Sequence, residues 1–149
     1  MTAKEYLKQI YYMNRKVKRL EARREQLRAQ MYSIGSPAGK MDADKVQTSM
    51  NGDTMLKLIA KVDEAERDML HEIDRMVEAQ ERIAGEIEKL SNDKQRDVLH
   101  KRYVEFKRWE QIAVDMNITL RHVYRIHGEA LQSFTKIFKD VIVCHKQKC

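Results

Sequence analysis

Apolar residues recur at alternating steps of three and four along the first part of the chain, which is the spacing of one helix face. The stripe runs from residue 3 to residue 31, and Arg24 is its charged interruption. Its apolar members are Ala3, Tyr6, Ile10, Met13, Val17, Leu20, Leu27 and Met31. This heptad-like spacing predicts an amphipathic helix over about residues 3–31, with one continuous seam.

A second stripe with the same spacing covers residues 54–90, with Glu66 and Gln80 as its polar interruptions. Its apolar members are Met55, Ile59, Val62, Met69, Ile73, Met76, Ile83, Ile87 and Leu90. Residues 32–53 hold three of the five glycines and the only proline, so they predict a loop. Two seams joined by a loop most simply form an antiparallel coiled-coil hairpin over residues 1–90, and parallel dimerisation is the alternative.

The hairpin also predicts which residues face each other. If Met31 lies opposite Ile59, the numbers of facing seam residues sum to 90, and Arg24 then lies opposite Glu66. The two charged interruptions of the seams would form an ion pair. Such a pair adds little net stability, but it can specify the register of the two helices.

After Leu90 the single stripe gives way to shorter segments, beginning with the helix-capping residues Ser, Asn and Asp. We expect helices at about 94–104, at about 108–116, and from 120 to beyond Phe138, in a second domain of residues 91–149. Their predicted shared core consists of Val98, Leu99, Tyr103, Trp109, Ile112, Ala113, Met116, Ile118, Val123, Ile126, Leu131 and Phe134. The predicted fold class is therefore all-α.

The segment WEQIAVDMNITLRHVYRIHGEAL has the spacing of a helix-turn-helix. Ala113 is small where two helices must approach closely, and Val123 follows in the core. Asn117 tolerates the left-handed backbone that such a turn needs. Thr119 can cap the next helix through its hydroxyl.

The second helix of this motif carries the side chains that core packing does not use. Arg can bind guanine or phosphate, His and Tyr can donate to phosphates or base edges, and a helix N-terminus favours phosphate. The predicted DNA-binding residues are Thr119, Leu120, Arg121, His122, Tyr124 and Arg125.

The segment from Leu90 to about Leu131 resembles region four of bacterial sigma factors, through LSNDKQRDVLHKRY, WEQIAVDMN and TLRHVYRIHGEAL. The whole chain is similar to a family of small prophage proteins of Gram-positive bacteria. The C-terminal part of that family is similar to ArpU- and RinA-type late transcription regulators. The resemblance implies a role in phage transcription. Nothing in the chain corresponds to sigma region two, which argues against a complete sigma factor.

Charge agrees with a polyanion as partner. Residues 1–52 carry a net +6, residues 53–90 carry −5 and residues 91–149 carry +5, for a total of +6. The chain has no long apolar run and no signal peptide, so we expect a cytoplasmic protein that contacts no membrane. On this interpretation it acts on DNA in a bacterial host cell.

Enzyme chemistry has no support in the sequence. No phosphate-binding glycine loop and no hydrolase motif is present, so we expect no catalytic residue and no cofactor. Cys144, His145 and Cys149 lack the paired clusters of a structural zinc site, so we expect no metal, and the thiols are expected to be reduced.

The leading hypothesis is a sequence-specific DNA-binding transcription regulator that binds double-stranded DNA and forms homo-oligomers through its helical hairpin. The first alternative is a sigma-like module that binds host RNA polymerase and contacts DNA weakly. The second alternative is a DNA-packaging subunit of the small terminase kind, which also joins a helix-turn-helix to helical assembly elements and forms large rings.

Overall fold

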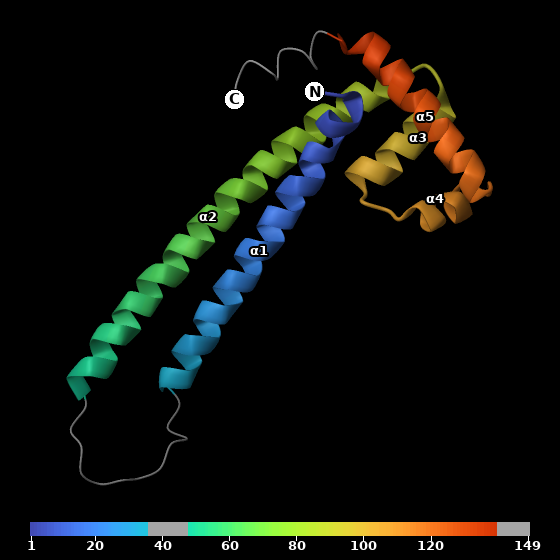
Figure 1. The fold of residues 1–149 in the computed structure, drawn as a ribbon. Helices are drawn as coiled ribbons and strands as arrows, with labels where there is room; N and C mark the ends of the chain where they lie inside the picture. Colours follow the sequence, from blue (N-terminus) through green and yellow to red (C-terminus); the bar gives the residue numbers. More distant parts are fainter. Residues whose placement is uncertain (36–47, 140–149) are drawn as a thin grey trace. The chain divides into compact units, whose positions relative to one another are not determined.

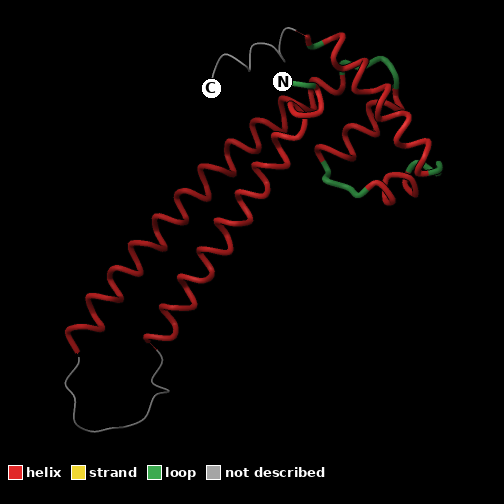
Figure 2. Tube along the Cα trace, viewed as in Figure 1, coloured by secondary structure: helices red, strands yellow, loops and turns green. Residues whose placement is uncertain are grey.

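The computed structural model describes residues 1–35 and 48–139. These residues form five α-helices and one π-helical turn, and no β-strand occurs among them (Figure 2). The predicted all-α class is therefore confirmed.

The two long helices are α1, Ala3–Gly35, and α2, Thr48–Glu88 (Figure 1). Thr2 and Glu5 form a capping box at the start of α1, in which each side chain accepts a hydrogen bond from the backbone N–H of the other. Both helices extend into the predicted loop 32–53, whose central residues 36–47 lie outside the described part. A single glycine such as Gly52 costs a helix only about 1 kcal/mol relative to alanine, which is too little to end it.

The remaining helices are α3, Asp93–Leu99, with the π-helical turn η1, His100–Val104, followed by α4, Trp109–Asp115, and α5, Leu120–Ile137. Asn92 caps α3 by accepting a hydrogen bond from the backbone N–H of Gln95 at 3.2 Å. These bounds agree with the predicted ranges, except that α5 ends just before Phe138.

The chain divides into two compact units. Unit 1 comprises residues 1–14 and 75–149, and unit 2 comprises residues 15–74. This division differs from the boundary that the sequence predicts at residue 90. Large apolar side chains near the start of α1 and the end of α2 share a core with α3 and α5, and this shared burial draws them into unit 1.

In unit 2, α1 and α2 run side by side in opposite directions (Figure 1). Lys16 donates to Glu72 at 2.8 Å, and Arg28 donates to Glu66. The residue numbers of these two pairs sum to 88 and 94. The bonds therefore lie close to the predicted register.

The predicted pairing of Arg24 with Glu66 is wrong. Glu66 binds Arg28, one turn further along α1, whereas Arg24 donates to its neighbour Glu25 at 2.8 Å. The side chain of Arg24 is only 20 % exposed, so it does occupy the seam. Arginine side chains are long enough to reach a carboxylate one turn away on the facing helix. Two charged residues at facing backbone positions therefore need not form an ion pair with each other.

The buried face of α2 is shifted from the predicted stripe. Its most buried positions in unit 2 are Leu58, Val62, Ala65, Met69 and Glu72. The predicted position Ile59 is 39 % exposed. A pattern of large apolar residues does not include Ala65 or Glu72. Ala65 is small, and Glu72 is charged and pairs with Lys16.

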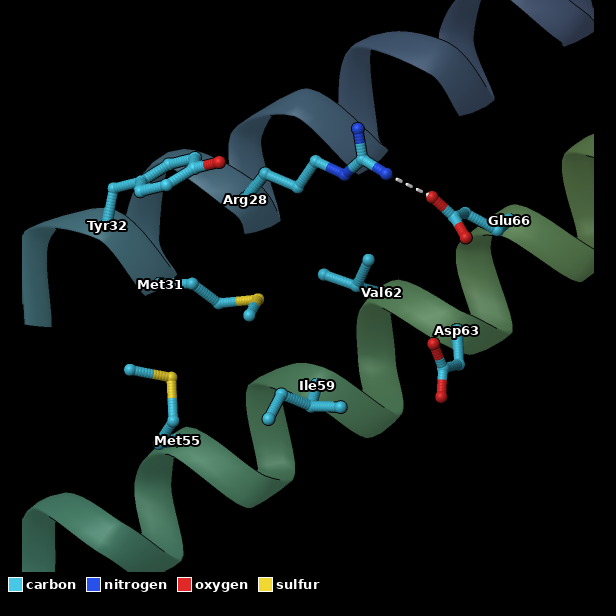
Figure 3. A pocket seen from close by; sticks show the side chains of 8 residues that line it. All are labelled: Arg28, Met31, Tyr32, Met55, Ile59, Val62, Asp63 and Glu66. Atoms are coloured by element: carbon cyan, nitrogen blue, oxygen red, sulfur yellow. Dashed lines mark hydrogen bonds and ion pairs between the residues drawn. The ribbon is translucent and has the colours of Figure 1, made fainter. Parts of the chain in front are cut away.

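A groove of about 880 Å³ lies between α1 and α2 at the end of unit 2 where the described parts of both helices begin or stop. Figure 3 shows the apolar side chains Met31, Met55 and Ile59 along it, with the Arg28–Glu66 ion pair at one end. Among the described residues, only side chains of α1 and α2 line this groove.

Unit 1 contains two apolar clusters instead of the single predicted core. The first cluster includes Tyr6 and Ile83 of the long helices together with Leu99 and Phe134 of α3 and α5. The second is built around Val98, Ile112, Val123 and Ile126, with Trp109, Ala113, Met116 and Ile118 packed against it. Every residue of the predicted core belongs to one of the two clusters.

Candidate nucleic-acid interface

The turn between α4 and α5 is closed by backbone hydrogen bonds. The N–H of Ile118 donates to the carbonyl of Ala113 at 3.0 Å, and the N–H of Asn117 donates to the carbonyl of Val114 at 3.1 Å. This is the Schellman arrangement, which needs a left-handed residue directly after the helix end. Asn117 has φ 51°, so the predicted left-handed asparagine is confirmed.

Thr119 starts α5 as its N-cap. Its backbone is extended, with φ −72° and ψ 151°, and its hydroxyl accepts a hydrogen bond from the N–H of His122 at 3.3 Å. The predicted capping role is therefore confirmed. Since one hydroxyl satisfies one of the free N–H groups of the first turn, the others remain available to a ligand.

The predicted DNA-binding residues occupy the first two turns of α5 and differ in their surroundings. Arg121 is exposed, and within the described residues it forms no hydrogen bond or ion pair. The Arg125 guanidinium, also exposed, lies 3.0 Å from Nε2 of His122 and 3.9 Å from a carboxylate oxygen of Glu129. Arg121 is therefore the freer of the two cations.

The other predicted residues are partly engaged. Tyr124 is 48 % exposed, and its ring lies 5.2 Å from the ring of Trp109. His122 is half-buried, Leu120 is 37 % exposed, and Thr119 is exposed. Tyr124 thus presents one edge to solvent while its other side packs against α4.

Trp109 anchors α4 against α5, as predicted for a core residue. Its ring meets the ring of His127 edge-on, with centroids 4.8 Å apart. The guanidinium of Arg102 lies 4.4 Å from the ring centroid of Trp109, within cation–π range. These contacts fix α4 and the exposed face of α5 relative to each other.

Behind the exposed face, His127 is a buried polar residue that the sequence did not single out. Nε2 of His127 and the hydroxyl of Tyr103 share a hydrogen bond of 2.9 Å. Burial lowers the pKa of His127 to about 4, with smaller contributions from the charges of Lys4 and Arg102. Burial also raises the pKa of Tyr103 to about 12. Both side chains are therefore neutral near pH 7, as their apolar surroundings require.

Ion pairs of Lys107 hold the loop before α4 in place. Lys107 forms ion pairs with Asp115 at 2.8 Å and with Glu105 at 2.9 Å, and these bonds raise the pKa of Lys107 to about 12. Phe106 has φ 57°, an unfavourable value for a bulky side chain, and its ring packs on the first cluster of unit 1. The loop therefore sets the start of α4 through ion pairs and packing together.

The exposed face of α5 continues beyond the predicted residues to Gly128 and Gln132, which lie seven residues after Arg121 and Arg125, respectively. A Cβ atom added at Gly128 would have no described heavy atom within 4 Å, so packing does not require a glycine there. Heptad spacing from the two arginines could have identified this continuation.

Among the described residues, no group of three or more His, Cys, Asp and Glu side chains could hold a metal ion. Cys144, His145 and Cys149 lie outside the described residues. Within residues 1–35 and 48–139, no helix has both the length and the apolar character needed to span a membrane.

Comparison with known proteins gives one match. Neither the curated proteins nor the solved structures contain a significant match to the chain. The model of a family described as "Protein of unknown function (DUF1492)" matches residues 33–135, more than two thirds of the 149 residues. This match includes α3, α4 and nearly all of α5. The chain therefore belongs to the DUF1492 family.

Proposed function

We propose that this protein is a sequence-specific DNA-binding transcription regulator, of the phage late-gene kind that its resemblance to sigma region four and to prophage regulators implies. In this proposal α4 and α5 form a helix-turn-helix of the sigma region 4 type. The long helices form an antiparallel coiled-coil hairpin that serves for assembly. No catalysis is part of the proposal.

The observation that carries the proposal is the face that α5 presents after a closed turn. Asn117 and Thr119 set the angle and the start of α5, and Arg121 and Arg125 project from its first two turns. The two arginines are four residues apart and therefore lie on the same side of the helix. A helix with this composition fits the major groove of DNA, where arginine recognises guanine.

The two arginines suit different roles. Arg121 has no partner among the described residues, so DNA binding breaks no internal bond of its guanidinium. The guanidinium of Arg125 forms a hydrogen bond with His122 and an ion pair with Glu129, and these contacts hold it along the helix. We assign base recognition to Arg121, and phosphate contact to Arg125 and to the N-terminus of α5.

One observation favours a second candidate function, that of a module that binds host RNA polymerase. Val114 of α4 is 79 % exposed. It borders a shallow cavity of about 480 Å³ that Ala113, Asn117, Ile118 and Thr119 also line. A protein partner that covered Val114 and filled this cavity would gain stability from the burial of apolar surface.

The hairpin is the proposed site of homo-oligomer formation. In unit 2, α2 leaves Leu56 67 % exposed and Leu70 57 % exposed, and a second copy that covered them would bury this apolar surface. Sedimentation velocity separates a dimer from the large ring that a DNA-packaging subunit forms.

The test is a binding selection on randomised duplexes with the full chain, its Arg121→Ala variant and, as control, Lys136→Ala. Lys136 is an exposed cation near the other end of α5. Arg121→Ala should cost about 1 to 3 kcal/mol on the preferred site and relax the preference at one base position. Lys136→Ala should leave that base preference unchanged.

Two outcomes contradict the proposal. If the wild-type chain binds no duplex at low salt, the protein is not a DNA-binding regulator. If it binds but Arg121→Ala keeps both the affinity and the base preference, α5 does not recognise the sequence. If the chain then still captures RNA polymerase, and Val114→Asp abolishes this capture, the result supports the polymerase-binding function.

A further inference from the structure

We propose that α1 carries a second DNA-binding surface, formed in unit 2 by Arg15, Lys18, Arg19 and Arg23, which contacts the phosphate backbone of a duplex. We call these four side chains the basic face. This surface acts separately from α5, because it lies in the other unit and recognises charge instead of bases.

The four cations lie on one side of α1. All four are exposed. At 3.6 residues per turn, their positions span an arc of about 140°. Glu21 and Glu25 are the acidic residues of this stretch, and both fall outside the arc. The arc is therefore uniformly positive.

None of the four cations is neutralised within the described part of the chain. Other basic residues of α1 take the nearby carboxylates: Lys16 pairs with Glu72, and Arg28 pairs with Glu66. The four residues of the basic face form no ion pair or hydrogen bond with described side chains. Glu72 and Glu66 of α2 are thus already paired, and the outer side of α1 keeps its positive charge.

The neighbours of the basic face favour a nucleic acid over a membrane or a protein. Besides the four cations, the residues of 15–26 that fall within the arc are Ala22 and Gln26. A helix that binds a membrane surface needs large apolar side chains beside its cations, and within residues 15–26 the large apolar side chains, Val17 and Leu20, fall outside the arc. A protein interface needs apolar or aromatic anchors, which the arc lacks over these residues. A phosphate backbone requires neither.

The spacing of the arginines suits a row of phosphates. Arg15, Arg19 and Arg23 follow each other at intervals of four residues, which is a rise of about 6 Å for each step. Each phosphate that a cation neutralises releases condensed counterions, so the affinity falls as the salt concentration rises. The three arginines of the basic face should therefore contribute about three phosphate contacts to the salt dependence of DNA binding.

The experiment compares two triple variants of the full chain with the wild type on a random-sequence duplex. The test variant is R15Q/R19Q/R23Q. The control is K57Q/K61Q/R67Q, which removes the same charge from exposed positions of α2 in the same unit. Far-ultraviolet circular dichroism checks that both variants keep the helix content of the wild type.

The expected result is a change in salt dependence. The slope of log K against log salt should become shallower by about 2.7 in the test variant, at about 0.9 for each lost phosphate contact. Between 50 and 200 mM salt, this makes the loss of affinity about 40-fold smaller than in the wild type. The control variant should retain the wild-type slope.

An unchanged slope in the test variant overturns the proposal, and so does an equal change in both variants, which would report only net charge. Loss of binding to anionic lipid vesicles without a change in DNA binding would assign the surface to a membrane and also overturn it. The function proposed for α5 fails on a different result, because it depends on the base preference that Arg121→Ala alters.

Discussion

Gly128 offers a test that separates stability from DNA binding at one position. It lies inside α5, on the same exposed face as Arg121 and Arg125. Glycine in a helix interior costs about 1 kcal/mol relative to alanine, because its backbone loses more conformational entropy on folding. A methyl group at Gly128 would meet no described atom within 4 Å. Gly128→Ala should therefore stabilise the protein by about 1 kcal/mol.

For a chain of this length, that gain raises the melting temperature by about 2 to 4 °C. If DNA lies against the face of α5, the same methyl group keeps the duplex away from the helix backbone. Binding should then weaken by about 1 kcal/mol, or about fivefold in Kd. If replacing a glycine by alanine raises stability but lowers ligand affinity, the glycine is needed for ligand binding and not for folding.

Gly85→Ala is the matched control. Gly85 is also exposed and inside a helix, and a Cβ there meets no described atom within 4 Å. It should give the same stabilisation in thermal melts and no change in a fluorescence-anisotropy titration of the duplex. Equal DNA affinity of Gly128→Ala and Gly85→Ala would refute the close approach of DNA to this part of α5. A failure of Gly128→Ala to stabilise would refute the reasoning on helix propensity.

Two further predictions concern stability. Burial lowers the pKa of His127 from 6.5 to about 4. As the pH falls, the unfolded chain therefore binds a proton at this histidine before the folded chain does. The free energy of unfolding should decrease by about 3 kcal/mol between pH 6.5 and pH 4. Urea unfolding at several pH values should show a smaller decrease for His127→Phe, and an identical decrease would mean that His127 is not buried as a neutral group. Ala65→Leu should destabilise by about 1 to 3 kcal/mol, because Ala65 is only 4 % exposed and a larger side chain does not fit there. Ala60→Leu, at an exposed position, should change stability by less than about 0.5 kcal/mol. Equal denaturation midpoints for the two leucine variants would show that the buried face of α2 is assigned incorrectly.

Features that depend on neighbours in the chain were predictable from the sequence. The turn at Asn117 and the cap at Thr119 rest on hydrogen bonds that span three to five residues. The helices of the second half also lie where the apolar spacing and the capping residues predict them. Such local bonds form wherever the right residues follow one another, so sequence alone identifies them.

Features that depend on distant partners were decided by tertiary structure. Glu72 is buried because Lys16, far away in the sequence, supplies its counter-charge, and Ala65 is only 4 % exposed although its side chain is a single methyl group. His127 likewise depends on the hydroxyl of Tyr103. A pattern of large apolar residues does not include these positions, since alanine, glutamate and histidine are buried only when the facing element fits them. The helices and the turn were therefore determined locally, whereas the buried face of α2, the choice of Arg28 over Arg24 and the two separate cores were determined by packing.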